Sequence, residues 1–369
     1  MSAGGALRFD VEAVDGAARA GVVTTARGAF ATPCFMPVGT RGAVRAVSSA
    51  DLEDLGAEVV LANAYHLMLR PGADVVAGLG GVHGFASWTG QVLTDSGGYQ
   101  VFSLEPSVDD DGVTFRSTYD GSSHRLTPEG AVRVQELLGA DIAMVLDVCP
   151  PLPSPPGDVR RAVERTAAWA RRCRDAHRRE GQALFGIVQG GVDEALRVES
   201  AERTVALGFD GHAVGGLSVG EGRDEMLAAL AATTVVLPAG APRYLMGVGD
   251  PVGLVEAVAL GVDLFDCVLP TRLARHGTVL TGGGRLNLRN AAHRGDGSPL
   301  DPDCPCPVCG RWSRAYLRHL LRVGDPGAVR LVTLHNLAWT LGLVRRARAA
   351  VVAGRLAALR SEVAAAWSA

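Results

Sequence analysis

Two aspartates have carboxylate side chains suited to chemistry at a sugar carbon, and each stands at the end of a short apolar run. Asp95 lies in the stretch TDSGGYQ and Asp266 in the stretch FDCVLPTR. If both carboxylates face one cavity, one can attack a carbon as nucleophile while the other moves protons. Retaining glycosidases divide the work between two carboxylates in the same way, through a covalent glycosyl-enzyme. A lone aspartate after a strand can equally be a helix cap, so the hypothesis depends on the pair.

A second group of residues has the hydrogen-bonding pattern of a purine-binding pocket. Asp147 can accept two N–H bonds from a guanine-type edge, and the Gln189 amide offers both a donor and an acceptor. Tyr99 and Met246 can stack on a flat ring, although either can equally belong to the core. Glycine-rich stretches lack the side chains that keep a ligand away from the backbone, although a plain tight loop has the same composition. Two such stretches occur here: Ser96, Gly97 and Gly98, and Gly215, Gly216 and Leu217.

Three cysteines form a C-x-C-x₂-C cluster at Cys304, Cys306 and Cys309. Structural zinc sites are closed by four thiolate or imidazole ligands, so a fourth ligand must come from elsewhere in the chain. The candidates for it are His335, His319 and His293. Free surface thiols are the alternative, and their reactivity makes such a cluster costly. We predict one structural Zn²⁺ per chain that fixes a late insertion to the rest of the protein.

The elements that must position these residues repeat along the chain as an apolar run followed by a turn and a helical pattern. Unbroken apolar runs are typical of parallel strands buried on both faces. The runs span residues 34–38, 59–63, 92–95, 142–147, 184–189, 212–216, 243–247 and 264–267, and the helical patterns span 48–56, 127–139, 158–180, 193–207, 223–236 and 251–260. Eight apolar runs with helical patterns between most of them predict a (β/α)₈ TIM barrel, whose active site forms where the strands end. The alternative is a doubly wound open sheet, but the glycine-rich dinucleotide fingerprint after the first strand is missing.

A (β/α)₈ barrel needs about 250 residues, so part of the chain must form insertions. We expect the barrel in residues 1–277, interrupted by a loop and hairpin at about 96–126. A zinc-binding subdomain is expected in residues 278–345, and a C-terminal helix packing on the barrel in 346–369.

Composition limits the possible partners. The net charge is −3 and lysine is absent, so an RNA partner would need a local patch of arginines. The seven cysteines are an odd number, which argues against a disulfide framework. The sequence shows neither a secretory signal nor a run long enough to span a membrane, so we expect a cytoplasmic protein without membrane contact.

At these residues the sequence resembles the tRNA-guanine transglycosylases. The corresponding segments, from about residue 87 to residue 335, are TDSGGYQVFSL, VLDVC, GIVQGG, AVGGLSVGE, RYLMGVGDP, FDCVLPTRLARHGTV, CPCPVC and SRAYLRHL. Each segment is weak alone, but their joint occurrence in this order is very specific.

The resemblance implies a TIM barrel with a zinc subdomain inserted near its end. It also implies exchange of guanine at the wobble position of a tRNA with a GUN anticodon for 7-aminomethyl-7-deazaguanine, a step of queuosine biosynthesis. Asp266 corresponds to the nucleophile that forms a covalent ribosyl intermediate, and Asp95 to the general acid/base of this double displacement.

The family's binding residues can be carried over in the same way. Asp147, Gln189, Gly216 and Leu217 correspond to the base pocket, with Tyr99 and Met246 stacking on the base. The zinc ligands correspond to Cys304, Cys306, Cys309 and His335. The segments that contact tRNA correspond to Gly247, Val248, Gly249, Asp250, Pro251, Val252, Gly253, Thr271, Arg272, Leu273, Ala274 and Arg275.

Further positions bear on substrate and assembly. Cys149 and Val219 fall where bacterial-type members carry Cys and Val, which favours the aminomethyl substrate, and Glu221 would then face its ammonium group. The resemblance also implies a homodimer through an aromatic patch made of Phe85, Trp312, Tyr316 and His319. Basic charge for tRNA is expected from Arg272, Arg275, Arg285 and Arg289. Two alternatives are a non-catalytic tRNA-binding paralogue of the same fold and a metal-dependent barrel hydrolase.

Overall fold

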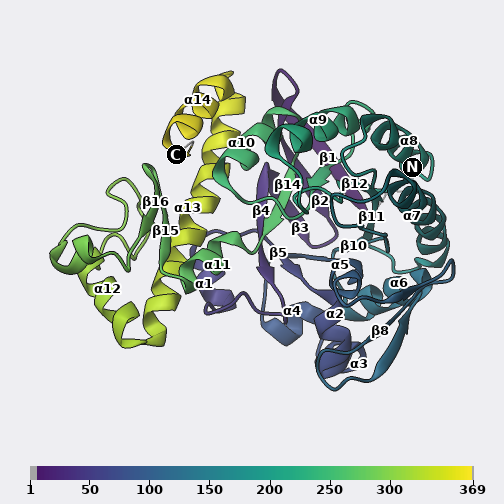
Figure 1. Ribbon diagram of the computed structural model, residues 1–369, viewed down its shortest axis with the longest axis horizontal. Helices are drawn as coiled ribbons and strands as arrows, with labels where there is room; N and C mark the ends of the chain where they lie inside the picture. The colour runs from purple at the N-terminus through teal and green to yellow at the C-terminus, as the bar shows by residue number, and fades with distance from the viewer. Residues whose placement is uncertain (1–5, 368–369) are drawn as a thin grey trace.

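Eight parallel strands close into a barrel in the computed structural model, which describes residues 6–367 (Figure 1). Every strand falls at one of the predicted apolar runs, so the predicted barrel is confirmed and the open sheet is excluded. The central strands are buried on both faces, which explains why they read as unbroken apolar runs. The strands are β4 (Cys34–Gly39), β5 (Val59–Ala62), β6 (Gln91–Thr94), β10 (Ile142–Met144), β11 (Ala183–Val188), β12 (Gly211–Val214), β13 (Arg243–Leu245) and β14 (Leu264–Cys267).

Helices connect successive strands and surround the barrel. The cap signals account for their bounds: α6 begins after the Thr127 side chain accepts from the Gly130 amide and ends at Gly139, which has a left-handed conformation. The segment between β5 and β6 is divided into several short helices. Apart from α5, which belongs to the insertion after β6, the described helices up to β14 are α1 (Ser49–Asp54), α2 (Ala64–Leu67), η1 (Met68–Gly72), α3 (Ala73–Gly78), α4 (Gly81–Ala86), α6 (Pro128–Leu138), α7 (Pro156–Ala176), α8 (Glu194–Val205), α9 (Arg223–Thr234) and α10 (Pro251–Ala259).

An antiparallel sheet precedes the barrel, and the sequence pattern did not predict it. It consists of β1 (Leu7–Asp15), β2 (Ala18–Thr25) and β3 (Gly28–Thr32). Buried Arg19 of β2 pairs with Asp263, next to the start of β14, and the Thr25 hydroxyl lies 2.7 Å from Gln91 Oε1 at the start of β6. The sheet therefore covers the end of the barrel where the strands begin, opposite the end where an active site is expected.

The predicted insertion after β6 contains a short helix and a small antiparallel sheet. These are α5 (Gly98–Phe102), β7 (Ser107–Val108), β8 (Val113–Arg116) and β9 (Ser123–Leu126). The turn between β8 and β9 contacts α2, because the Tyr65 hydroxyl lies 3.2 Å from Thr118 Oγ1.

After β14 the chain builds a lobe beside the barrel, on the left of Figure 1. Its hydrophobic core is separate from that of the barrel and includes Leu288, Leu300 and Leu317. Helix α13 runs through residue 345, the predicted end of the subdomain, and α14 pairs with α10 through Arg360 and Glu256. The elements are α11 (Leu269–Arg275), β15 (Thr278–Thr281), β16 (Gly284–Asn287), η2 (Ala291–Gly295), α12 (Arg314–Val323), α13 (Pro326–Val352) and α14 (Leu356–Trp367).

Within residues 6–367, none of the helices has the length and apolar character needed to cross a bilayer.

Candidate active site

Asp95 and Asp266 lie at the same end of the barrel, where β6 and β14 give way to loops. Their charges interact: the pKa of Asp95 is raised to about 7, mainly by burial and also by the carboxylates of Asp266 and Asp147, against opposing backbone hydrogen bonds. The structure therefore brings three predicted carboxylates into one site. Three acidic groups that share a desolvated site cannot all ionise easily, which is a common property of acid–base centres.

Asp95 is held by groups from the neighbouring strand. Asn63, which follows β5, donates from Nδ2 to Oδ2 at 2.6 Å. The amides of Ala64 and Gly97 donate to Oδ1 at 2.8 and 3.2 Å. These bonds fix the carboxylate at the mouth while its raised pKa leaves it able to take up and release a proton near neutral pH.

Asp266 has a different environment, with one oxygen held and the other free. Tyr244, on the adjacent strand β13, donates its hydroxyl to Oδ1 at 2.6 Å, and the Gly247 amide donates to the same atom at 2.8 Å. Oδ2 accepts no hydrogen bond from the described residues. Burial raises the pKa of Asp266, whereas both hydrogen bonds favour its ionised form. The free oxygen of an oriented carboxylate is the arrangement that a nucleophile requires.

Asp147 and Gln189 form the polar wall of a pocket beside the two carboxylates. Gln189 donates from Nε2 to Asp147 Oδ2 at 2.6 Å, while its own Oε1 is buried without a partner. Burial raises the pKa of Asp147 to about 6. A buried acceptor without a donor is costly, so this atom is available for an N–H group of a ligand. Gly216 packs against it in a left-handed conformation with φ of +65°, and a Cβ there would collide with Gln189 Oε1.

Arg197 holds the backbone beside this pocket, and the sequence analysis missed it. It lies on α8, is fully buried, and has no carboxylate partner among the described residues. Its guanidinium donates to four carbonyls that follow β11 and β12, namely those of Val188, Gly191, Gly215 and Gly216, at 2.7 to 3.1 Å. The only signal in the sequence was an arginine on the apolar face of a helix.

The other residues predicted for the pocket lie around this wall. Leu217 is buried, and Met246 Sδ lies 3.5 Å from where a Cβ on Gly215 would be. Ser96 Oγ accepts from the Gly98 amide at 3.2 Å and so closes the turn after Asp95. Tyr99 is 61% exposed, which makes it available for stacking and excludes it from the core.

Glu221 differs from the expectation that its carboxylate would face a ligand. Its two oxygens accept from the backbone amides of Ser218 and Val219 instead. The carboxylate therefore stabilises the loop after β12, in which Ser218 has a positive φ of 60°.

The predicted metal ligands meet in the lobe, away from the carboxylates. The ligand atoms of Cys304, Cys306, Cys309 and His335 all lie within 4.8 Å of one another. His335 donates from Nε2 to the Leu280 carbonyl at 2.8 Å, which leaves the lone pair of Nδ1 facing the sulfurs. Three thiolates and one imidazole fit a closed, structural zinc site. Of the other candidates, His293 pairs with Asp296 and His319 is exposed.

The segments expected to contact tRNA are only partly accessible. Gly247 and Arg272 are exposed, and Asp250, Val252, Leu273 and Arg275 are half-buried. The remaining members are buried and shape the backbone, with no side chain free to reach RNA: Val248, Gly249, Pro251, Gly253, Thr271 and Ala274.

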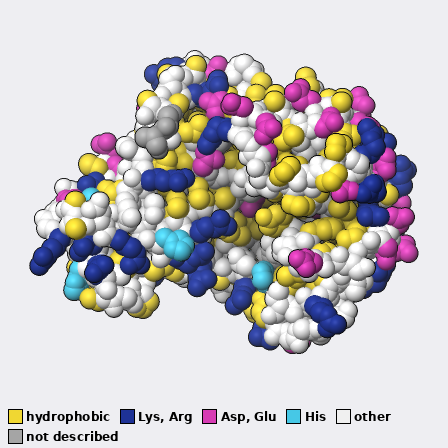
Figure 2. Space-filling model, in the orientation of Figure 1, with side chains coloured by type: hydrophobic (Ala, Val, Ile, Leu, Met, Phe, Trp, Pro, Cys, Tyr) yellow, Lys and Arg dark blue, Asp and Glu magenta, His cyan; other side chains and the backbone are white. Residues whose placement is uncertain are grey.

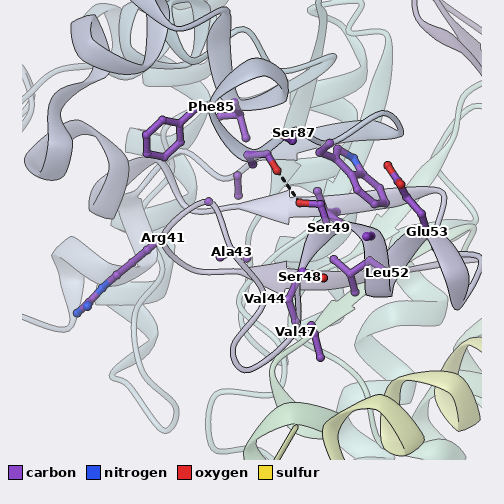
Figure 3. Close-up of a pocket in the computed structure, with 18 of the residues that line it drawn as sticks. Arg41, Ala43, Val44, Val47, Ser48, Ser49, Leu52, Glu53, Phe85 and Ser87 are labelled. Carbon is purple, nitrogen blue, oxygen red and sulfur yellow. Dashed lines mark hydrogen bonds between the residues drawn. The ribbon is translucent and has the colours of Figure 1, made fainter. Parts of the chain in front are cut away.

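A cavity of about 540 Å³ lies next to the active-site mouth but does not contain it (Figure 3). It is enclosed by the loop after β4, by α1 and by α4, with Phe85 and Trp88 among its lining residues. Neither Asp95 nor Asp266 lines it, so the carboxylate geometry, rather than this cavity, defines the candidate active site.

Comparison with known proteins gives a consistent result over nearly the whole chain. A family model described as queuine tRNA-ribosyltransferase matches residues 15–369. The queuine tRNA-ribosyltransferase of Halothermothrix orenii is 51% identical over 347 residues, which cover 94% of this chain and 93% of that protein. The protein of the same name from Gloeobacter violaceus is 52% identical, over 95% of this chain and 94% of its own length. That of Acetivibrio thermocellus is 47% identical, over 97% of this chain and 97% of its own length.

Proposed function

Because the chain belongs to the queuine tRNA-ribosyltransferase family and is a tRNA-guanine transglycosylase, we propose that Asp266 and Asp95 carry out its base exchange by double displacement. The observation that supports this most strongly is the pair of carboxylates with unlike environments. Asp266 has one oxygen fixed and one free, and Asp95 has a pKa of about 7.

In the first displacement, Asp266 Oδ2 attacks C1′ of the target ribose and the bond from C1′ to N9 of guanine breaks. The electron pair of that bond goes to N9, which takes a proton from the carboxyl group of Asp95. Tyr244 and the Gly247 amide hold Oδ1 of the nucleophile, so that Oδ2 points at the substrate. The product is a ribosyl ester of Asp266, with guanine released as the neutral base.

In the second displacement, the incoming base loses its N9 proton to the Asp95 carboxylate. Its N9 then attacks C1′, the ester bond to Asp266 breaks, and the nucleophile leaves as a carboxylate. Asp95 ends protonated, with the N9 proton of the incoming base in place of the one that left with guanine, so the cycle balances. A pKa of about 7 suits a group that must both donate and accept a proton near neutral pH.

Base recognition is assigned to Asp147, Gln189 and the Gly216 backbone. The incoming base that we propose is 7-aminomethyl-7-deazaguanine, because it keeps the guanine edge that these groups can bind. Gln189 and the Gly216 backbone form hydrogen bonds with Cys149, which supports a position for this thiol beside the proposed pocket. Tyr99 and Met246 are proposed to stack on the ring.

The tRNA would bind across the mouth and along the lobe. Figure 2 shows arginines gathered on the lobe and beside the adjacent hollow, whereas the opposite side of this face mixes both signs of charge. Exposed Arg272 and half-buried Arg275 on α11 connect the two regions. The target nucleotide must leave its stack to reach the barrel end, as in other enzymes that act on a base. We propose a tRNA with a GUN anticodon as the substrate, and place the reaction in the cytoplasm.

We propose that the cluster of three cysteines and His335 holds one structural Zn²⁺ per chain. When bound, the metal would join residues 304–309 to helix α13 and so fix the lobe. We propose that the lobe is a zinc-binding unit of residues 278–345. It would lie in the chain between the barrel of residues 1–277 and the terminal segment 346–369. The closed donor set leaves no position for substrate, so the exchange chemistry is assigned to the carboxylates alone.

A homodimer is proposed through the aromatic patch of Phe85, Trp312, Tyr316 and His319. Phe85 is 37% and Tyr316 45% exposed, so both rings keep apolar surface that a partner subunit could cover.

Incubation of the protein with tRNA and labelled guanine, with and without the aminomethyl deazaguanine, tests this proposal. Label should enter the tRNA, and the deazaguanine should prevent or chase that incorporation. A non-catalytic paralogue would bind tRNA without incorporation, and a metal-dependent hydrolase would release base without replacing it.

A further inference from the structure

Two arginines share one aromatic ring at the edge of the active-site mouth. The guanidinium carbons of Arg41 and Arg70 lie 5.5 and 4.7 Å from the centroid of the Tyr119 ring. The Tyr119 hydroxyl is fixed by His66 Nδ1 at 2.9 Å. These four residues, the Tyr119 cluster, come from three separate segments: the loop after β4, the segment from α2 to η1, and the turn between β8 and β9.

Within residues 6–367, no carboxylate forms an ion pair with the arginines of this cluster. Neither Arg41 nor Arg70 has a carboxylate or hydrogen-bond partner among residues 6–367. The adjacent Asp120 is engaged within its own turn, where it accepts from the Ser122 amide and hydroxyl at 3.1 and 2.6 Å. Two like charges that share one ring repel each other unless an anion lies between them. By contrast, the helix α7 arginines at 160, 161, 165 and 172 are all paired with acidic residues.

The cluster is connected directly to the catalytic residues. His66 lies in the first turn of α2, whose Ala64 amide and Asn63 cap both donate to Asp95. In Figure 3, the Arg41 side chain points away from the cavity beneath its loop. The same loop also carries Arg45. Burial lowers the pKa of Arg275, and so do the positive charges of Arg45 and Arg272. In the described part of the chain, neither Arg45 nor Arg272 nor Arg275 forms an ion pair with a carboxylate.

We propose that the Tyr119 cluster binds a backbone phosphodiester of the substrate RNA, next to the nucleotide that enters the barrel. A guanidinium can bind phosphate oxygens in pairs, and stacking on a ring limits the rotamer freedom lost on binding. The RNA backbone would then be held on one side of the target nucleotide by Arg41 and Arg70 and on the other by Arg272 and Arg275. This inference rests on the proposed function, because it needs an RNA substrate.

The test measures binding of a fluorescein-labelled anticodon stem-loop RNA by anisotropy over a range of KCl concentrations. The double variant Arg41→Gln/Arg70→Gln should weaken binding and lower the slope of log K against log salt by about 0.7, the value for one phosphate on a single strand. Tyr119→Phe keeps the ring and should bind nearly as the wild type, whereas Tyr119→Leu should weaken binding. In the exchange reaction the double variant should raise KM for RNA while kcat and the affinity for guanine stay unchanged.

The matched control is Arg171→Gln, which removes an exposed α7 arginine without a carboxylate partner in the described chain. An unchanged salt slope in the double variant, or an equal loss in the control, would overturn the phosphate site. Absence of guanine exchange in the wild type would instead refute the proposed function, and the two failures are therefore distinguishable.

Discussion

The three carboxylates at the barrel mouth have different tasks because their hydrogen-bond partners differ. Asp95 receives three donors and still has a pKa of about 7, since burial and two neighbouring charges outweigh them. Asp266 receives two donors on one oxygen, and Asp147 receives the Gln189 amide. The sequence predicted all three aspartates, because each follows an apolar run. It did not predict Tyr244, whose hydroxyl is hidden inside another such run.

Tyr244→Phe should slow the exchange reaction without unfolding the protein. The ring remains in the core, but Asp266 loses a 2.6 Å hydrogen bond to its charged form. Without this bond the pKa of Asp266 rises and the carboxylate is less well oriented, so kcat should fall by roughly 10-fold. Steady-state guanine incorporation measures it, and an unchanged kcat would mean that the tyrosine does not support the nucleophile.

Asp147→Asn should stabilise the free protein at pH 8 but not at pH 4. Burial raises the folded-state pKa of Asp147 to about 6 from an ordinary value of 3.8, so the unfolded chain loses this proton first as the pH rises. The contribution of the group to stability is present below pH 3.8 and is lost as the pH rises through 6, by at most about 3 kcal/mol. Thermal unfolding of both proteins at the two pH values measures the difference in stability between variant and wild type. A difference that is the same at pH 4 and pH 8 would mean that the carboxylate is not desolvated.

The strands and the loops that follow them were predictable to different degrees. Buried parallel strands leave a strong signal, so the eight runs located the barrel. The antiparallel sheet of β1 to β3 was missed. Its strands β1 and β3 are partly exposed, so they lack the unbroken apolar runs that marked the barrel strands. The loops after β11 and β12 depend on contacts between distant segments. Arg197 fixes both of them through four carbonyls, and no local pattern specifies such a contact.

Arg197→Met should destabilise the fold and also weaken guanine binding. The substitution keeps an apolar stem but leaves buried carbonyls unpaired, which costs about 1–3 kcal/mol each if no water replaces the guanidinium. Chemical denaturation and calorimetric titration with guanine measure the two effects. A variant with normal stability and normal guanine affinity would contradict the assigned role, whereas Arg203→Met, at an exposed position of the same helix, should change neither.

At the scale of the molecule, helix α13 joins the barrel to the lobe, whose hydrophobic core is separate. Helix α13 carries His335 toward the lobe and packs along the barrel with its following turns, so metal binding and barrel packing share one element. The sequence predicted the cysteine cluster from spacing alone. Spacing left three histidines open as the fourth ligand, and the family resemblance pointed to His335. The fold brings that residue to the cysteines, because α13 carries it there.

Cys309→Ser should remove the metal and loosen the lobe while the barrel keeps its base site. Bound zinc should fall from one per chain to a small fraction, and the lobe should become sensitive to protease because its closed site is lost. Guanine affinity should stay within about twofold, since the cluster lies outside the pocket. His319→Ala is the matched control and should retain full zinc. Elemental analysis decides the point, and metal retained by the serine variant would contradict the ligand set.

The central claim is that the free oxygen of Asp266 forms a covalent bond to the target ribose. Wild-type protein incubated with tRNA and quenched in denaturant should yield a protein–RNA adduct, and peptide mapping should locate the ribosyl group on Asp266. Asp266→Asn should yield none while still binding the RNA. An adduct in that variant, or one mapped to Asp95 or Asp147, would contradict the account.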